Sequence, residues 1–320
     1  MTLNEKKKIG RAKRLAIGVF IIAIVTSTGL FIGFTSWKRE TSARLQTGSQ
    51  VAQTSRGQIE YATRGEGPVI LLIHGTPGGY DQSMDFVSKN LEFKIIAVSR
   101  PGYLRTPLAT GRTPAEQADA FAALLDVLKI PKVAVAAISN GGPSALQFAL
   151  RYPERCWGLV LICATTQPKT AASRPSSFNY QELFLISDFA QWFALKMPWK
   201  LMPEELKEKF PTDEKREMFF KVAGSTAPIS LRRAGVNNDR TQITTMLTTY
   251  PLENIRCPAL ILHGAEDTWV PISDAAFAAG KIPAAELVRF EKGDHFFLIT
   301  HKEEAEPKLI AWLKAHAPEI

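Results

Sequence analysis

The sequence predicts an α/β protein in which helices cover a mostly parallel sheet and a membrane-spanning helix precedes that sheet. Short apolar runs rich in Val, Ile and Ala alternate with helical patterns from residue 58 onward. Such alternation is typical of βαβ units, because neighbouring parallel strands need a crossover between them. The alternation stops after Gln167 and resumes at Pro258. The interval between them therefore predicts an insertion.

Twenty uncharged residues, 15–34, precede the sheet-forming sequence. At about 1.5 Å per residue, a helix of this length spans about 30 Å, the thickness of a bilayer core. The segment is longer than the apolar region of a signal peptide, about 7–15 residues, and no Ala-x-Ala site follows it. We therefore expect a transmembrane signal anchor that binds the membrane through residues 15–34. A cleaved signal peptide and a buried helix are the alternatives.

The basic residues around this segment predict its orientation. Six precede it, in residues 1–14, and three follow soon after it. Because cytoplasmic flanks carry the excess of Lys and Arg, residues 1–14 should form a basic cytoplasmic tail. The rest of the chain would then be extracytoplasmic, in a periplasm or outside the cell.

The net charge of +8 does not indicate nucleic-acid binding. Residues 1–40 hold eight basic and two acidic residues, which leaves 31 basic and 29 acidic residues for 41–320. A nearly balanced globular part lacks the basic surface that a nucleic-acid partner requires. The hydrophobic fraction of 45% and the charged fraction of 22% are ordinary for a globular protein.

After the apolar segment, residues 35–55 are polar and show no helical or strand periodicity, which predicts a linker. We expect strands at 58–65, 68–75, 93–102, 132–139, 157–166, 258–267 and 285–295. We expect helices at 81–91, 113–130, 141–153, 272–282 and 302–316. The second of these helices starts with Thr113 as N-cap, Pro114 at its first position and Glu116 to complete a capping box.

The insertion, residues 168–250, is helical in pattern and rich in aromatic residues. Ten of them lie between positions 176 and 220: Phe178, Tyr180, Phe184, Phe189, Trp192, Phe193, Trp199, Phe210, Phe219 and Phe220. They should form a small core of the insertion, and some of them could cover an apolar pocket.

Three cysteines, Cys156, Cys163 and Cys257, are too few for a disulfide framework and fit no metal site by their spacing. Cys156 and Cys257 each precede a strand-like run. If those strands are neighbours, a disulfide could join them, although two buried thiols are the favoured state.

The carboxyl ends of the expected strands carry the residues with chemical potential, since ligands of open α/β sheets bind there. Three ends supply Ser139, Asp267 and His295, in that order. Ser139 follows a buried strand in "AISNGG", with small residues Ala137 and Gly141 two positions away on each side. A sharp strand–nucleophile–helix turn demands small residues there. An N-cap role would explain the serine but not its small neighbours.

A histidine base needs a carboxylate that fixes its tautomer. His295 lies in a turn after the last strand, and Asp267 lies just past the end of "ALILHG". Glu266 is the alternative acid, and Asp294 should brace the loop. His74 and His263 precede glycines at strand ends and should shape turns.

Five strand-end motifs, "HGTPGG", "RPGY", "ISNGG", "HGAED" and "GDH", occur here in the order and at the separations of the α/β-hydrolase superfamily. The chain resembles serine carboxylesterases and lactonases of that superfamily that carry a helical lid. The resemblance implies an eight-stranded sheet built from 56–167 and 251–320, with 168–250 as a lid after the sixth strand. It also implies an oxyanion hole from the backbone N–H groups of Asn140 and Thr76, since Pro77 has none.

Departures from the superfamily's patterns narrow this resemblance. The usual G-x-S-x-G begins here with Ala137, which is sterically acceptable. Epoxide hydrolases and haloalkane dehalogenases use an aspartate nucleophile, so Ser139 counts against both. Proline iminopeptidases share the His-Gly-x-Pro-Gly stretch but carry a different turn at the nucleophile.

These inferences predict a serine hydrolase that cleaves a small-molecule carboxylic ester or lactone with an apolar or aryl group, without cofactor or metal. The alternatives are a C–C bond hydrolase of ring-fission dienoates and a non-catalytic membrane-anchored binding protein of the same fold. Arg232, Arg233 or Asn237 could meet a substrate carboxylate, although bracing of the lid or exposure to solvent is the favoured role of the arginines.

Overall fold

The structure, a computed structural model, describes residues 3–86, 92–168, 186–243 and 250–319. It divides into two units, Met1–Arg44 and Leu45–Ile320, of which the second contains the sheet.

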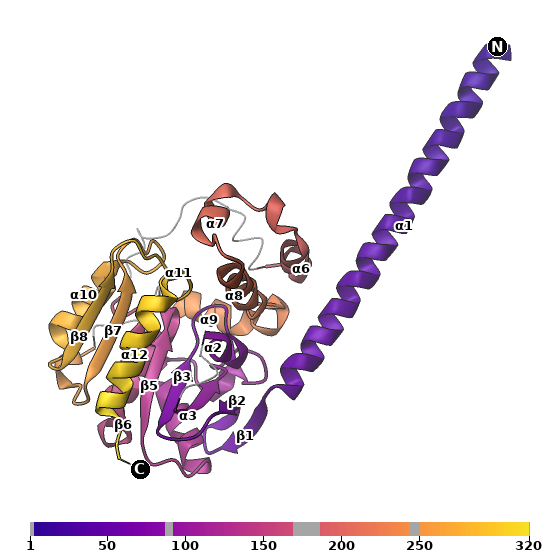
Figure 1. Ribbon diagram of the computed structural model, residues 1–320. Coiled ribbons are helices and arrows are strands. Elements are labelled where there is room, and N and C mark those ends of the chain that lie inside the picture. The colour runs from indigo at the N-terminus through magenta and orange to yellow at the C-terminus, as the bar shows by residue number, and fades with distance from the viewer. Residues whose placement is uncertain (1–2, 87–91, 169–185, 244–249, 320) are drawn as a thin grey trace. The chain divides into compact units, whose positions relative to one another are not determined.

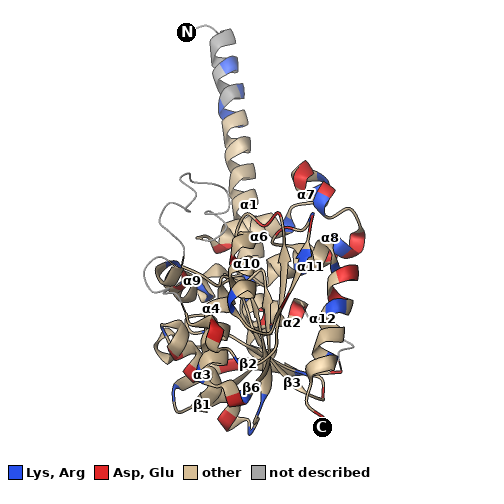
Figure 2. Cartoon of the chain, turned by 90° about the vertical axis from the view of Figure 1, so that its left-hand side faces the viewer, with Lys and Arg blue, Asp and Glu red and all other residues tan. Residues whose placement is uncertain are grey.

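The first unit consists of most of helix α1, Leu3–Thr47. Within this helix, Lys13–Thr47 contain a stretch of mean hydropathy 2.5 that is long and apolar enough to cross a membrane. The side chains of this stretch are exposed, and Figure 2 shows basic residues near the start of α1 followed by an uncharged length. These properties are consistent with a membrane anchor or a signal sequence.

Residues 35–55 differ from the expected linker in their secondary structure. Helix α1 continues to Thr47, and Gln50–Thr54 form strand β1. The continuation of the helix uses local contacts, such as the hydrogen bond from the Ser36 hydroxyl to Glu40 four residues later at 2.8 Å. The strand pairs with β2 across a tight turn, and this pairing has no strong signature in so polar a sequence.

The second unit is built on a mixed, mostly parallel sheet of eight strands in the order β1-β2-β4-β3-β5-β6-β7-β8 (Figure 1). The strands are β1 Gln50–Thr54, β2 Gly57–Arg64, β3 Val69–Ile73, β4 Lys94–Val98, β5 Val133–Ile138, β6 Cys156–Ile162, β7 Ala259–Gly264 and β8 Ala285–Phe290. Strands β3 to β8 are parallel, and β1 and β2 pair antiparallel at one edge. The predicted eight-stranded, mostly parallel sheet is therefore confirmed.

Helices cover both faces of the sheet (Figure 1). They are α2 Tyr80–Phe86, α3 Pro114–Val127, α4 Gly142–Arg151, α10 Ile272–Lys281, α11 Phe297–Thr300 and α12 Lys302–His316. Helix α3 starts as its sequence predicts, with Thr113 as N-cap, Pro114 as its first residue and Glu116 completing the capping box.

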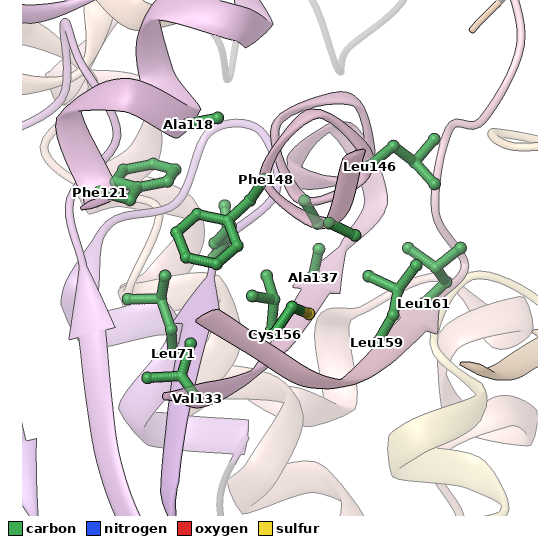
Figure 3. Close-up of a cluster of buried hydrophobic side chains, with 14 of the residues drawn as sticks. Leu71, Ala118, Phe121, Val133, Ala137, Leu146, Phe148, Cys156, Leu159 and Leu161 are labelled. Atoms are coloured by element: carbon green, nitrogen blue, oxygen red, sulfur yellow. The ribbon is translucent and has the colours of Figure 1, made fainter. Parts of the chain in front are cut away.

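Alternate residues of each strand point to opposite faces, which gives the sheet two hydrophobic cores. In β5, Val133, Val135 and Ala137 pack with α3, α4 and α10, whereas the intervening Ala134 and Ala136 pack with α11 and α12. Figure 3 shows the first core, where Phe121 of α3 and Phe148 of α4 lie over strand residues such as Leu71. Burial on both faces explains why these strands are continuous apolar runs.

The insertion between β6 and β7 is helical where the structure describes it. Its helices are α6 Asp188–Lys196, α7 Glu204–Lys209, α8 Asp213–Gly224 and α9 Arg233–Thr241. Ser187 and Thr212 cap α6 and α8, each accepting a backbone N–H with its hydroxyl. Residues 169–185 and 244–249 lie outside the described part.

The described aromatic residues between positions 186 and 220 pack against one another in two groups, one around Phe210 and Phe219 and one around Phe189. Phe210 is buried and stacks on Phe219 with a centroid distance of 4.6 Å. Their cluster also takes in Ile299 and Phe296 from the segment around α11. Phe189 and Phe193 are exposed, at 43% and 53%. Phe178, Tyr180 and Phe184 lie outside the described residues.

Cys156 and Cys257 are neighbours, as their strands are. Their sulfur atoms lie 3.5 Å apart, and both residues are buried free thiols. The pair lies at the end of β6 opposite to Ser139, because Cys156 opens that strand.

Candidate active site

Ser139 occupies a sharp turn between β5 and α4. Its φ of +51° is uncommon for a residue with a side chain. Its carbonyl accepts the Thr165 N–H at 3.0 Å, which ties the turn to the loop after β6. The residue is 8% exposed. A strained serine at the carboxyl end of a central parallel strand, just before a helix N-terminus, is the arrangement of a nucleophile turn.

The chain around this turn leaves no room for side chains. A Cβ at Gly141 would lie 2.8 Å from the carbonyl oxygens of Ile73 and His74, and one at Gly142 would lie 2.3 Å from the Thr165 carbonyl oxygen. A Cβ at Gly75 would lie 2.8 Å from Cβ of Ser139 itself. The small residues of "AISNGG" are thus explained by close backbone approach, as the sequence suggested.

Asp267 and His295 are joined directly. Nδ1 of His295 and Oδ2 of Asp267 lie 2.7 Å apart. The other carboxylate oxygen, Oδ1, accepts the backbone N–H groups of Trp269 at 2.8 Å and Val270 at 2.9 Å. Burial alone would raise the pKa of Asp267, but the hydrogen bonds from His295, Val270 and Trp269 outweigh it and lower the pKa. The carboxylate therefore stays charged and holds Nδ1 of the imidazole, which leaves Nε2 for a reacting group.

The neighbouring acids are placed differently. Glu266 is exposed. Asp294 forms an ion pair with Lys209 of the insertion, and its carboxylate also accepts the Phe296 N–H at 2.9 Å. Of the three carboxylates, Asp267 is the one hydrogen-bonded to His295.

Ser139 and His295 lie at the same edge of the sheet. β5 and β6 pair in register up to Ile138 and Ile162, so Ser139 and Cys163 both follow directly. The Cys163 thiol lies 3.6 Å from the carbonyl oxygen of His295. Within the described residues, the Ser139 hydroxyl makes no hydrogen bond to His295.

Thr76 and Asn140, the expected oxyanion residues, contact each other. The Asn140 side-chain amide donates to the Thr76 hydroxyl at 3.2 Å, and its carbonyl accepts the Thr165 hydroxyl at 2.9 Å. In the described part of the chain, neither the Thr76 nor the Asn140 backbone N–H donates to a protein acceptor. Both N–H groups are therefore free to bind an oxyanion.

The sequence did not reveal a buried cluster beside Thr76. Asp239 of α9 accepts hydrogen bonds from the Arg100 guanidinium at 2.8 and 2.5 Å, from the Tyr103 hydroxyl at 2.5 Å and from the Thr76 hydroxyl. Burial, followed by the Asp239 charge, raises the pKa of Tyr103 well above its usual range, so its hydroxyl stays a donor. Arg100 and Tyr103 belong to the strand-end motif "RPGY", whereas Asp239 lies in a polar stretch without a recognisable motif.

Arg232 and Arg233 hold the insertion in place, which is a role that the sequence favoured for them. Arg232 is fully buried and forms an ion pair with Asp81 at 2.8 Å. Arg233 is exposed and donates to the carbonyl of Ile186 at 2.9 Å. Asn237 is exposed. None of the three lies among the groups bonded to the candidate site residues in the described part of the structure.

Cys163, Asp267 and His295 each present one atom that could bind a metal, all within 4.8 Å of one another. Oδ2 of Asp267 and Nδ1 of His295 already bond to each other, so a metal there would replace that hydrogen bond. Burial and the Asp267 charge raise the pKa of the Cys163 thiol well above its usual range. A protonated thiol is a poor metal ligand.

An aromatic wall adjoins the candidate base. The Trp269 ring lies 4.9 Å from the His295 ring and 5.3 Å from that of Phe296. Trp269 is 49% exposed. An apolar group bound beside His295 would cover it.

Comparison with known proteins places this chain in a family. Residues 68–302 match the family described as alpha/beta hydrolase fold, a range that contains all five expected site residues. The chain belongs to the α/β-hydrolase fold family. It is 30% identical over 273 residues to the uncharacterized hydrolase YcgS of Bacillus subtilis, covering 78% of this chain and 92% of that protein.

Solved structures agree with this α/β-hydrolase assignment. An alpha/beta hydrolase fold protein from Nakamurella multipartita has a TM-score of 0.76 and 28% identity, with 83% of this chain and 99% of that one covered. A thermophilic esterase from Thermogutta terrifontis has a TM-score of 0.60 and 22% identity over 84% of this chain and 99% of its own, which is a likeness of fold. The predicted resemblance to the α/β-hydrolase superfamily is therefore confirmed.

Proposed function

We propose that this α/β hydrolase cleaves carboxylic esters with an apolar or aryl group through Ser139, His295 and Asp267. The observation that carries the proposal is the 2.7 Å contact between Asp267 and His295 at the sheet edge where Ser139 adopts its strained turn. The base then has an acid that orients it, and both lie at the edge of the sheet that carries the nucleophile.

In the proposed reaction, His295 Nε2 takes the Ser139 proton as Oγ attacks the ester carbonyl carbon. The backbone N–H groups of Thr76 and Asn140 bind the oxyanion that forms. The protonated His295 gives its proton to the leaving alcohol as the C–O bond breaks. Water, deprotonated by His295, then attacks the acyl-enzyme, and Ser139 regains its proton as the carboxylic acid leaves.

The apolar substrate class rests on the aromatic wall of Trp269 and Phe296 beside His295. Esters differ from lactones, amides and dienoates in the bond cleaved, and the same three residues could act on each. A panel of these substrates at equal concentration decides among them. Release of a carboxylic acid from a ring-fission dienoate at a higher kcat/KM than from any ester would favour the C–C hydrolase alternative.

The test of the nucleophile compares Ser139→Ala with Ser144→Ala. Ser144 is buried in α4, and its hydroxyl donates to Gln117 at 2.6 Å. Hydrolysis of p-nitrophenyl butyrate and labelling by a fluorophosphonate should disappear in Ser139→Ala and persist in Ser144→Ala. Turnover and labelling that survive Ser139→Ala would refute the proposal. An inert wild-type chain would favour the non-catalytic binding protein.

We also propose that residues 15–34 anchor the protein in a membrane with the hydrolase unit outside the cytoplasm. The support is the exposed apolar length of α1 and the basic residues before it. The full chain should stay in the membrane fraction after alkaline carbonate extraction, and added protease should digest the hydrolase unit in spheroplasts. A mature chain that lacks residues 15–34 would instead show a cleaved signal peptide.

A further inference from the structure

Asp239 connects the insertion to the candidate oxyanion residues. It lies in α9 with its side chain 3% exposed. Two groups of Arg100 and the hydroxyl of Tyr103 donate to its carboxylate at 2.5 to 2.8 Å. These donors hold the carboxylate in one orientation, with the charge balanced by Arg100.

The same carboxylate oxygen that binds Tyr103 also accepts the Thr76 hydroxyl. Thr76 in turn accepts the Asn140 side-chain amide at 3.2 Å, and Asn140 accepts the Thr165 hydroxyl at 2.9 Å. A continuous line of hydrogen bonds thus runs from α9 to the residue after Ser139. It holds the side chains of both residues whose backbone N–H groups stay free.

A second buried ion pair provides the comparison. Arg232 of the insertion binds Asp81 of α2 at 2.8 Å, and the two side chains are 0% and 6% exposed. Arg232 also donates to the Gly78 carbonyl at 2.6 Å. Asp81 itself bonds to neither Thr76 nor Asn140 among the described residues. Both pairs join the insertion to the core, but only the Asp239 pair extends to the candidate oxyanion residues.

We infer that Asp239 is a positioning residue for the oxyanion hole, supplied by the insertion. By fixing the Thr76 hydroxyl, it fixes the direction of the Thr76 N–H, and through Asn140 it restrains the second N–H. This inference rests on the proposed ester hydrolysis. Its effect belongs to the transition state, because the oxyanion develops only there.

The test uses the full chain in detergent, with p-nitrophenyl butyrate as substrate. Asp239→Asn should lower kcat about 10- to 100-fold, as expected for slightly misplaced oxyanion donors, with KM changed less than about threefold. Asp81→Asn is the matched control, since it removes a buried insertion–core charge without touching Thr76. It should lower the Tm but keep kcat within about threefold.

Thr76 supplies a second test that does not depend on the folding of Asp239→Asn. Thr76→Val keeps the backbone N–H and the side-chain size but removes the hydroxyl, so it should lose kcat as Asp239→Asn does. Thr76→Ser restores the hydroxyl and should recover most of the activity. The double variant Asp239→Asn/Thr76→Val should be no slower than the slower single variant, because both break the same line of hydrogen bonds.

Equal losses of kcat in Asp239→Asn and Asp81→Asn would show that Asp239 only braces the insertion. Wild-type kcat in Thr76→Val would also overturn the inference. Failure of the proposed function looks different: the wild-type chain would then show no turnover that depends on Ser139, and both proposals would fall together.

Discussion

Two histidines lie near the Asp267 carboxylate, and they differ in their distance from it and in their exposure. His263 Nε2 lies 3.6 Å from Oδ2 of Asp267 and 2.8 Å from the Val270 carbonyl oxygen, and its side chain is 0% exposed. His295 Nδ1 lies 2.7 Å from the same Oδ2, and its side chain is 12% exposed.

In the proposed reaction, one carboxylate serves both structure and chemistry. His263 donates to Val270 and so holds the turn whose N–H groups bind Asp267. Burial lowers the pKa of His263, which keeps it neutral. His295 has its second nitrogen directed away from Asp267, where a substrate proton could be exchanged. Proximity to an aspartate alone does not make a histidine a base.

The largest expected effect separates the two imidazoles directly. His295→Ala should lower kcat for ester hydrolysis by about 10⁶-fold, the scale seen when the base of such a triad is removed. His263→Gln keeps a donor near Val270 and should lower kcat less than about 100-fold, mainly through a looser Asp267. Steady-state kinetics with p-nitrophenyl butyrate measure both. Comparable losses in the two variants would contradict the assignment of His295 as the base.

The next-largest effect distinguishes Asp267, which is hydrogen-bonded to His295, from Asp294, which directly precedes His295 in the sequence. Asp267→Asn should lower kcat about 10⁴-fold, because an amide fixes the wrong tautomer of the imidazole. Asp294→Asn is the control, since it loses only a partly exposed ion pair with Lys209. It should keep kcat within about threefold, with the same assay as readout. A larger loss in Asp294→Asn than in Asp267→Asn would reverse their roles.

The smallest effect is a change in the pH dependence of stability. His263 has a lowered folded pKa, so the unfolded chain binds a proton below about pH 6.5 that the folded chain refuses. Its contribution is complete above that pH and is lost as the pH falls toward the folded pKa. Burial and the Arg100 charge lower the pKa of His74 in the same sense.

Between pH 5 and 6.5, the free energy of unfolding measured with urea should therefore rise more steeply with pH in the wild-type protein than in His263→Gln. The difference should stay below about 1.4 kcal/mol per pH unit, which is the limit for one proton. The part of this pH dependence that comes from His74 should remain in the His263→Gln variant. Parallel curves for the two proteins would mean that His263 titrates normally in the folded state.

Much of this architecture could be predicted from the sequence because the decisive signals are local. Apolar runs such as "VAVAAI" are buried on both sides, and the capping box at Thr113 marks the start of α3. Ser139, Asp267 and His295 could be selected as candidate site residues because each follows a strand that the pattern identifies. The contact between Asp267 and His295 was expected because both follow strand ends and a histidine base needs a carboxylate, with Glu266 as the alternative acid.

What escaped prediction depends on contacts between distant residues. Strand β1 forms by pairing with β2, and its sequence "QVAQT" is as polar as a linker. Asp239 lies 163 positions from Thr76, in a helix whose sequence shows no motif. Its importance arises from burial beside Arg100, which no spacing along the chain encodes.

The core supplies the basic residue of one ion pair with the insertion and the acidic residue of the other. This arrangement limits the exchange of insertions between related proteins. Arg100 and Asp81 belong to the core, whereas their partners Asp239 and Arg232 belong to the insertion. A chimera that received the insertion of a relative would need both an acid and a base at matching positions. Either mismatch would bury an uncompensated charge, at a cost of about 3–5 kcal/mol. New specificity is therefore best sought by substitutions on the aromatic wall, with the two anchoring residues of the insertion left in place.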